Sequence, residues 1–190
     1  CALAWGADSP LVPRDGGNVS GAAPLFLVLL IAAFAAYLAA LLLIRRTTPS
    51  ARAVIVLAAA IQLVPLGAPL LLSTDAWTYW SYGWIGARGD GNPYTDAPEE
   101  FPDNPALPYM GSDWLDTTSV YGPAFTMASE PLAVVAGDSE GVAAWTYKAL
   151  AGCAALAAAL LAGRLARRRS FAIALVGWNP LLAVHLAGGG

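Results

Sequence analysis

The sequence predicts an all-α protein that crosses a membrane several times, with one long loop outside the cytoplasm that contains short helices lying on the membrane surface. Three observations support this. The hydrophobic share is 57% and the charged share 12%, against about 45–50% and about 25% in soluble domains. Two long stretches carry no charge, and the arginines gather in two short loops while the carboxylates gather in one long segment.

Four segments are predicted to span the membrane. Residues 21–44 and 53–72 are free of charge, and at about 1.5 Å per residue each can cross a hydrocarbon layer of roughly 30 Å. Residues 141–163 form a third apolar segment, whose single charge, Lys148, lies near one end. Residues 171–187 form the fourth and shortest. We expect all four to be helices.

The N-terminal segment, residues 1–20, is polar and rich in Gly and Pro, and it begins at Cys1 without an initiator Met. We therefore expect the chain to be part of a longer protein, and lipid modification of Cys1 is the alternative. Cys153 lies among alanines in the third span, where a small apolar side chain is the simplest explanation. These cysteines predict no disulfide framework.

The arginines predict the orientation in the membrane. Short loops rich in Lys and Arg stay in the cytoplasm, so the loops at residues 45–52 and 164–170 are assigned there. These arginines are Arg45, Arg46, Arg52, Arg164, Arg167, Arg168 and Arg169. Residues 73–140 must then lie outside the cytoplasm, and their many carboxylates are opposed by one cation, Arg88. The net charge of −3 hides this division and gives no indication of nucleic-acid binding.

The second span is interrupted by Gln62, Pro65, Gly67 and Pro69. A proline inside a helix removes a hydrogen bond and bends the axis. Irregular backbone at membrane depth is tolerated where it faces protein or a cavity. The bend either directs the end of the helix towards a cavity or is one of the ordinary kinks of membrane helices.

The stretch from Ser73 to Tyr94 is the centre of the predicted site. As a helix it can be capped by residues 73–75, and Trp77, Trp80 and Trp84 then share one face. Aromatic rings with polar tips favour the depth where lipid meets water. Asp75 lies at the positive end of the helix dipole, so we expect it to be ionised and to face outward, where it can act on a substrate arriving from the lipid.

The rest of the outer segment is predicted to alternate turns with short helices. Gly89 to Tyr94 forms a tight turn, and residues 96–108 are an acidic, proline-broken loop. Tyr121-Gly122-Pro123 forms a second turn that starts an apolar helix running through Val135. Glu130 interrupts that helix and could face inward.

These motifs, in this order, resemble the polytopic glycosyltransferases of the GT-C class. The resemblance is carried by Asp75 with Tyr79 and Tyr82-Gly83 behind it, Gly91-Asn92-Pro93-Tyr94, Trp114, Tyr121-Gly122-Pro123 and Asn179-Pro180. Within the class, the sequence is most similar to bacterial polyprenol-phosphate-mannose-dependent α-1,6-mannosyltransferases. The resemblance covers roughly residues 60 to 190 and implies the N-terminal part of a larger protein with about ten or more membrane helices.

The resemblance implies transfer of a sugar, expected to be mannose, from a polyprenyl-phosphate donor to a glycan or glycolipid acceptor at the outer face of the cell membrane. An ionised carboxylate at that depth can accept the proton of the acceptor hydroxyl, which is worth roughly 10²–10⁴-fold in rate. A single base suffices for inversion at the sugar carbon. Asp75 is therefore predicted to be the general base, and the alternative is a plain helix N-cap worth about 1 kcal/mol.

Several side chains are predicted to contact the substrate. A charge inside a span costs on the order of 2.5–3.5 kcal/mol, so Lys148 is expected either to reach the donor phosphate or simply to extend to the interface. Arg88 competes for the phosphate. The remaining candidates could bind sugar rings or serve as interfacial anchors and turn formers, and they are Tyr79, Tyr82, Asn92, Tyr94 and Tyr121.

Other chemistries lack a motif. No His/Cys/Asp cluster has metal-ligand spacing, and a ligand role for His185 is less expected than bridging between helices. No glycine-rich phosphate loop follows a strand, so nucleotide sugars are not expected as donors, and no cofactor is predicted. The alternative function is a transporter or flippase for a lipid-linked sugar, with Asp75 and Lys148 as a coupling pair.

Overall fold

The computed structural model describes residue 12, residues 22–88 and residues 90–189. Within these ranges the protein is all-helical and contains no β-strand, which confirms the predicted all-α class. Most of the N-terminal segment, including Cys1, lies outside the described residues, as does Gly89 of the predicted tight turn.

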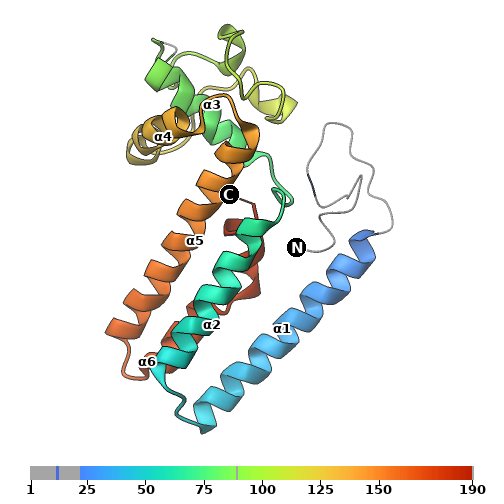
Figure 1. Cartoon of the computed structure of the whole chain (residues 1–190), viewed down its shortest axis with the longest axis vertical. Coiled ribbons are helices and arrows are strands. Elements are labelled where there is room, and N and C mark those ends of the chain that lie inside the picture. The colour runs from blue at the N-terminus through green and yellow to red at the C-terminus, as the bar shows by residue number, and fades with distance from the viewer. Residues whose placement is uncertain (1–11, 13–21, 89, 190) are drawn as a thin grey trace.

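Two groups of helices make up the fold (Figure 1). The helical layer consists of α1 (Ala22–Arg46), α2 (Ala51–Leu63), α5 (Glu140–Leu165) and α6 (Arg169–Gly177). The cap covers one end of this layer and consists of α3 (Asp75–Arg88), α4 (Pro123–Ala136) and the loops between them. The short elements are the 3₁₀-helices η2 (Val64–Gly67), η3 (Pro98–Glu100) and η4 (Ser112–Trp114) and the π-helical turn η5 (Leu182–Leu186).

Two of the helices have the length and composition of membrane spans, namely Pro24–Arg46 and Glu140–Leu165. The apolar stretch Ala51–Gly67 is shorter. It stops being α-helical where Pro65 enters the chain, because proline has no N–H to donate. Likewise α6 ends at Gly177, just before Asn179-Pro180, so the second and fourth predicted segments are each broken into a helix and a short turn.

Small residues bring α2, α5 and α6 close together. Gly177 lies so near α2 and α5 that an added Cβ would be 2.7 Å from the Ala58 Cβ and 3.2 Å from the Ala159 Cβ. Gly163 packs in the same way on Ile173. Such residues allow apolar helices to approach closely. The three helices therefore form the tight part of the layer.

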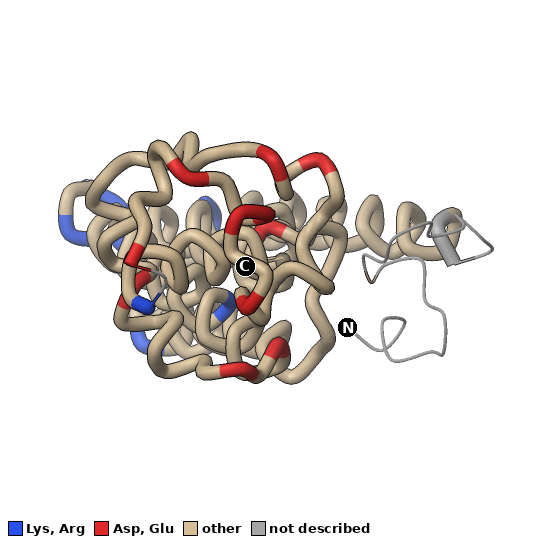
Figure 2. Tube along the Cα trace, turned by 90° about the horizontal axis from the view of Figure 1, so that it is seen from above, with Lys and Arg blue, Asp and Glu red and all other residues tan. Residues whose placement is uncertain are grey.

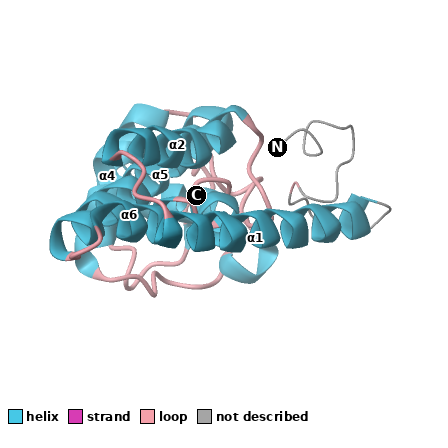
Figure 3. Cartoon of the chain, turned by 90° about the horizontal axis from the view of Figure 1, so that it is seen from below, coloured by secondary structure: helices cyan, strands magenta, loops and turns pink. Residues whose placement is uncertain are grey.

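Helix α1 is attached more loosely. Its last turns bury Leu41 and Ile44 against α2 and α6, and the Tyr37 hydroxyl donates to the Leu175 carbonyl oxygen at 2.6 Å. Towards its N-terminus α1 diverges from the other helices, as Figure 1 shows from the side and Figure 3 from below. Most of its apolar side chains are exposed, among them Leu27 at 56% and Ile31 at 59%. An apolar surface of this kind suits contact with lipid or with another helix.

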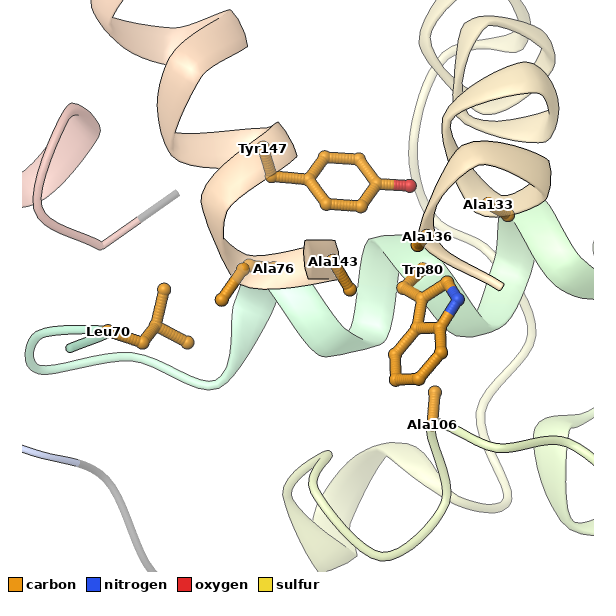
Figure 4. Packing of buried hydrophobic residues seen from close by; sticks show 9 residues of the cluster. Leu70, Ala76, Trp80, Ala106, Ala133, Ala136, Ala143 and Tyr147 are labelled. Carbon is orange, nitrogen blue, oxygen red and sulfur yellow. The ribbon is translucent and has the colours of Figure 1, made fainter. Parts of the chain in front are cut away.

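The cap is centred on Trp80 (Figure 4). Its indole is fully buried and packs on alanines from three neighbouring parts of the chain, Ala106, Ala133 and Ala143. Trp77 and Trp84 pack partly buried against the same cluster. The tryptophan face of α3 therefore points into the cap, because these alanines leave a space that the large rings fill, and the predicted depth of these rings at the lipid boundary stays a prediction.

Charge is divided between the two ends of the molecule. The arginine-rich turns between α1 and α2 and between α5 and α6 lie at the end away from the cap (Figure 1). Viewed onto the cap, the acidic positions are spread over the near surface (Figure 2). The division that the sequence predicts along the chain is thus also a division in space.

Candidate active site

Asp75 is the first residue of α3 and is half-buried. The Ser73 hydroxyl accepts a hydrogen bond from the Asp75 amide at 3.0 Å, and the Thr74 carbonyl accepts the amides of Trp77 and Thr78. The start of the helix is therefore capped by residues 73 and 74, as the sequence allowed. Among the described residues no capping hydrogen bond uses the Asp75 carboxylate, which leaves that group available for chemistry.

The backbone just before Asp75 is strained. Leu72 has a φ of 64°, and the Ser73 amide donates to the Leu71 carbonyl at 2.8 Å. A hydrogen bond that encloses a single residue with positive φ has the pattern of a classic γ-turn, which is rare and strained. For a residue with a Cβ such a backbone costs of order 1–3 kcal/mol and persists only where the surroundings impose it. The chain therefore enters α3 through a turn held by its neighbours.

Lys148 lies in the interior, with 1% of its surface exposed. Its ammonium donates to the carbonyl oxygens of Ala68 at 2.5 Å and Pro69 at 3.4 Å. The carbonyls that follow η2 therefore take up the charge in this structure, and the predicted reach of Lys148 to the outer interface or to the donor phosphate stays a prediction. A phosphate contact by Lys148 would require this enclosed amine to leave both partners.

Aromatic side chains adjoin Asp75 one helical turn further along α3. The Tyr79 ring lies edge-on to Tyr121, with centroids 5.0 Å apart, and to Phe125 at 4.9 Å. It also contacts the ring of Tyr147 on α5 at 5.6 Å. Three helices and the turn at Tyr121 thus meet around one tyrosine. Two of these aromatic residues, Phe125 and Tyr147, were not singled out from the sequence, because only the packing of α4 and α5 on α3 brings them here.

The phenol groups of Tyr79 and Tyr121 respond to the Asp75 charge. Burial raises the pKa of Tyr79 well above its usual range, and the neighbouring Asp75 carboxylate raises it further. The pKa of Tyr121 is raised by the same two causes in the same order. Both phenols therefore stay protonated and neutral at physiological pH. Asp75, Tyr79 and Tyr121 form one group, in which the charge of one carboxylate acts on two phenols.

Tyr82 and Tyr94 serve the fold with their hydroxyl groups. Tyr82 is 1% exposed and donates to the Thr117 carbonyl at 2.7 Å, and burial followed by the Tyr121 charge raises its pKa to about 12. Tyr94 donates to the Tyr121 carbonyl at 3.0 Å. Both bonds hold the loop that carries Tyr121, so these two tyrosines help to fix the position of Tyr121 beside Tyr79.

Asn92 folds its own turn. Its side-chain oxygen accepts a hydrogen bond from the Tyr94 backbone amide at 3.0 Å, and its own backbone amide donates to an Asp96 carboxylate oxygen at 2.7 Å. That backbone hydrogen bond, together with one from the Thr95 hydroxyl, lowers the pKa of Asp96. The Asn92 oxygen is thus engaged by the backbone, as expected for a side chain that stabilises a turn.

The remaining candidates are dispersed. Glu130 lies where α4 meets α3, so close to Gly86 that an added Cβ would be 2.9 Å from its carboxylate. Arg88 is exposed at the end of α3, and His185 is exposed in η5. Within the part of the chain that the structure describes, no three His, Cys, Asp or Glu side chains gather in a way that could hold a metal ion. None of these residues joins the Asp75 group.

An apolar groove lies elsewhere in the molecule. A groove of about 770 Å³ runs between α1 and the α2–η5 region and is lined almost entirely by apolar side chains, including Phe26, Ile61 and Trp178. Among the described residues that line it there is no carboxylate, and Asp75 is not one of them. Acid–base chemistry therefore points to the Asp75 group rather than to this groove.

Comparison with known proteins identifies a family. Residues 8–190 match the MptA_B family, described as "Alpha-(1->6)-mannopyranosyltransferase, N-terminal domain". The chain is similar to two curated proteins named Alpha-(1->6)-mannopyranosyltransferase A. The Corynebacterium glutamicum protein is 29% identical over 67% of this chain and 27% of its own length. The Mycobacterium tuberculosis protein is 34% identical over 64% of this chain and 25% of its own length.

The chain thus spans about a quarter of the length of these relatives. No solved structure matches it. The family match covers nearly the whole sequence, including the segments that hold Asp75, Tyr79 and Tyr121. The chain therefore belongs to the α-(1→6)-mannopyranosyltransferase family, in its N-terminal domain.

Proposed function

We propose that this domain carries the general base of a membrane mannosyltransferase that moves mannose from a polyprenyl-phosphate donor to a cell-envelope glycan or glycolipid. The observation that carries the proposal is the Asp75 group. A half-buried carboxylate, which the helix start does not need as a cap, lies beside the phenols of Tyr79 and Tyr121. The family match and the names of the relatives support the reaction class.

The proposed placement is a multi-pass, GT-C-like arrangement in the cell membrane. The four helices of the layer and the short turns that continue α2 and α6 cross the bilayer, and the cap lies at its outer surface. The arginine-rich turns at the end away from the cap support this orientation, because short cationic loops stay in the cytoplasm. The cap then faces the side where a prenyl-linked sugar presents its head group.

The reaction is a single displacement. The acceptor hydroxyl oxygen attacks the anomeric carbon, its proton passes to an Asp75 carboxylate oxygen, and the bond from that carbon to the phosphate oxygen breaks. The electron pair of that bond leaves with the polyprenyl phosphate. One displacement inverts the anomeric configuration and requires one base. Proton transfer to such a base contributes roughly 10²–10⁴-fold to the rate.

Tyr79 and Tyr121 are the aromatic residues proposed to contact the sugar, because they are partly exposed beside Asp75. Tyr82 and Tyr94 support these two residues by holding the loop that carries Tyr121, and Asn92 holds its own turn. The transporter interpretation is not favoured, since the named relatives are transferases and Lys148 is bonded to backbone carbonyls rather than to Asp75.

The test is Asp75→Asn in the full-length protein, assayed with a synthetic polyprenyl-phosphate mannose and a glycan acceptor. We expect transfer to fall by roughly 10²-fold or more, with unchanged expression and elution from a sizing column. Asp138→Asn is the matched control, because it removes the same charge from an exposed position of the cap, and it should transfer at the normal rate. Normal transfer by Asp75→Asn would contradict the proposal.

A further inference from the structure

We infer that Lys148 is a positioning residue, which holds the strained turn at Leu72 and thereby sets the place of Asp75, rather than a ligand of the donor phosphate. This inference rests on the proposed function. It concerns the short connection between η2 and α3, residues 68–74, which we call the entry strap. The strap has no regular helix of its own, so its course depends on what holds it.

Lys148 holds the first part of the strap. A helix end leaves carbonyl oxygens without partners, and Ala68 is the residue that ends η2. The Lys148 ammonium reaches across from α5 and bonds the carbonyls of Ala68 and Pro69. A cation near the C-terminal end of a helix is favoured by the same partial charges. Lys148 therefore fixes the level at which the strap begins.

A second contact holds the middle of the strap. The Leu71 amide donates to the Gly188 carbonyl at 2.9 Å, and an added Cβ on Gly189 would be 3.1 Å from the Leu71 carbonyl oxygen. The C-terminal part of the described chain is thus pressed against the strap. Lys148 bonds the start of the strap and Gly188 bonds its middle, so the strap is held at two points.

Between these contacts and Asp75 lies the strained turn. Leu72 keeps a positive φ although an ordinary side chain disfavours it, and the Ser73 hydroxyl then accepts the Asp75 amide. Strain at this place requires anchors on the strap, and Lys148 is the one whose bonds come from a charged side chain. Only Ser73 and Thr74 lie between Leu72 and Asp75, so a shift of the strap is passed directly to Asp75.

The experiment compares kcat with the KM for the donor in full-length Lys148→Met and Lys148→Gln. Methionine keeps most of the volume but donates no hydrogen bond, whereas the glutamine amide can still donate to a carbonyl. We expect Lys148→Met to lower kcat by about 10- to 100-fold, the effect of a misplaced catalytic group, while the donor KM changes less than about twofold. Lys148→Gln should recover most of kcat.

Leu72→Gly supplies a second readout. Glycine adopts positive φ without the penalty of a side chain, so the turn should depend less on its anchors. Combined with Lys148→Met, it should restore part of kcat. A residue that merely stabilises the fold would change the folded yield but would not give this recovery in kcat per folded molecule.

Other outcomes would overturn the inference. A donor KM raised by about tenfold or more at unchanged kcat, in both Lys148→Met and Lys148→Gln, would identify Lys148 as a phosphate ligand. Wild-type kinetics in Lys148→Met would show that it positions nothing. If Lys148→Met fails to fold, Lys148→Gln decides: a smaller fall in kcat at an unchanged donor KM supports the inference, and an unchanged kcat, with or without a raised donor KM, refutes it. In each case Asp75→Asn still tests the base separately.

Discussion

The helical layer and the cap are built by different means. In the layer, α2, α5 and α6 approach one another through glycine and alanine, and apolar side chains cover the outside. In the cap, large aromatic rings fill the interior, and side chains hold the loops through hydrogen bonds to backbone carbonyls. Small residues make a close-packed support, whereas rings and directed bonds fix individual atoms. The chemistry is accordingly expected where the bonds are directed.

The boundary between the two regions combines both features. Gln62, fully buried at the end of α2, donates to the Gly177 carbonyl at 3.1 Å where α6 ends. Lys148 bonds the carbonyls after η2 in the same manner. Each polar side chain satisfies backbone that a break in a helix has freed, as required in surroundings without water. The helical layer thus places polar side chains at the points where its helices are broken near the cap.

The largest expected contrast between the regions is in their cores. Trp80→Ala removes the central ring of the cap, and we expect a loss of about 3–5 kcal/mol in the free energy of unfolding. Ile31→Ala removes a side chain of α1 that is 59% exposed, and in detergent it should change stability little. Thermal melting of both variants measures the contrast. Equal losses would show that the cap is not the better-packed region.

The contact between α3 and α4 gives the next largest effect. An added Cβ on Gly83 would be 2.4 Å from the Ser129 carbonyl oxygen, and overpacking of this kind costs about 1–3 kcal/mol. Gly83→Ala should therefore lower the melting temperature. Gly141→Ala in the first turn of α5 is the control, because no atom lies within 4 Å of the added Cβ. An undisturbed Gly83→Ala would mean that the two helices are less tightly packed than described.

Within the cap, the hydroxyl of Tyr79 separates catalysis from packing. Tyr79→Phe keeps the ring among Tyr121, Phe125 and Tyr147 but removes the donor beside Asp75. We expect kcat to fall about tenfold, the equivalent of about 1.4 kcal/mol, at unchanged melting temperature. Steady-state kinetics of the full-length protein check this. A loss of stability without a loss of kcat would make Tyr79 a packing residue.

The smallest expected effect is the response of the cap to alkali. The pKa of Tyr82 is raised to about 12 in the folded protein, from about 10 in an unfolded chain. Below pH 10 both states are protonated, and as the pH rises towards 12 the unfolded state ionises first, so stability falls in that window. Tyr82→Phe should flatten this fall while costing about 1 kcal/mol at neutral pH for the lost bond to Thr117.

Melting curves between pH 8 and about 12 test this prediction. A fall equally steep in Tyr82→Phe would assign the alkaline response to other groups, such as Tyr79, whose pKa is also raised by burial.

Local patterns in the sequence carried much of the fold. The all-α class and the helix after Tyr121-Gly122-Pro123 follow from composition and from the geometry of glycine and proline, and α4 begins at Pro123 as that turn predicts. The helix that starts beside Asp75 follows from the same kind of reasoning, because the residues that cap it are its immediate neighbours. Local structure can be predicted from the sequence wherever the contacts that decide it lie within a few residues.

The faces of the helices were harder to assign. The tryptophans of α3 share a face as predicted, but alanines far away in the sequence decide that this face is buried. Lys148 bonds backbone carbonyls of the entry strap, eighty and seventy-nine residues away in the sequence. No local pattern indicates which partner the charged end of a long side chain will find across such a separation.

By itself, the sequence determined the helical class, the separation of arginines from carboxylates and Asp75 as the candidate base, because these depend on composition and on residues close together in the chain. Tertiary structure alone decided that Phe125 and Tyr147 join Tyr79, that Tyr82 and Tyr94 brace the loop, and that Lys148 anchors the entry strap. The reason is physical: these side chains act through contacts between helices, and a contact between distant segments exists only once the chain has packed.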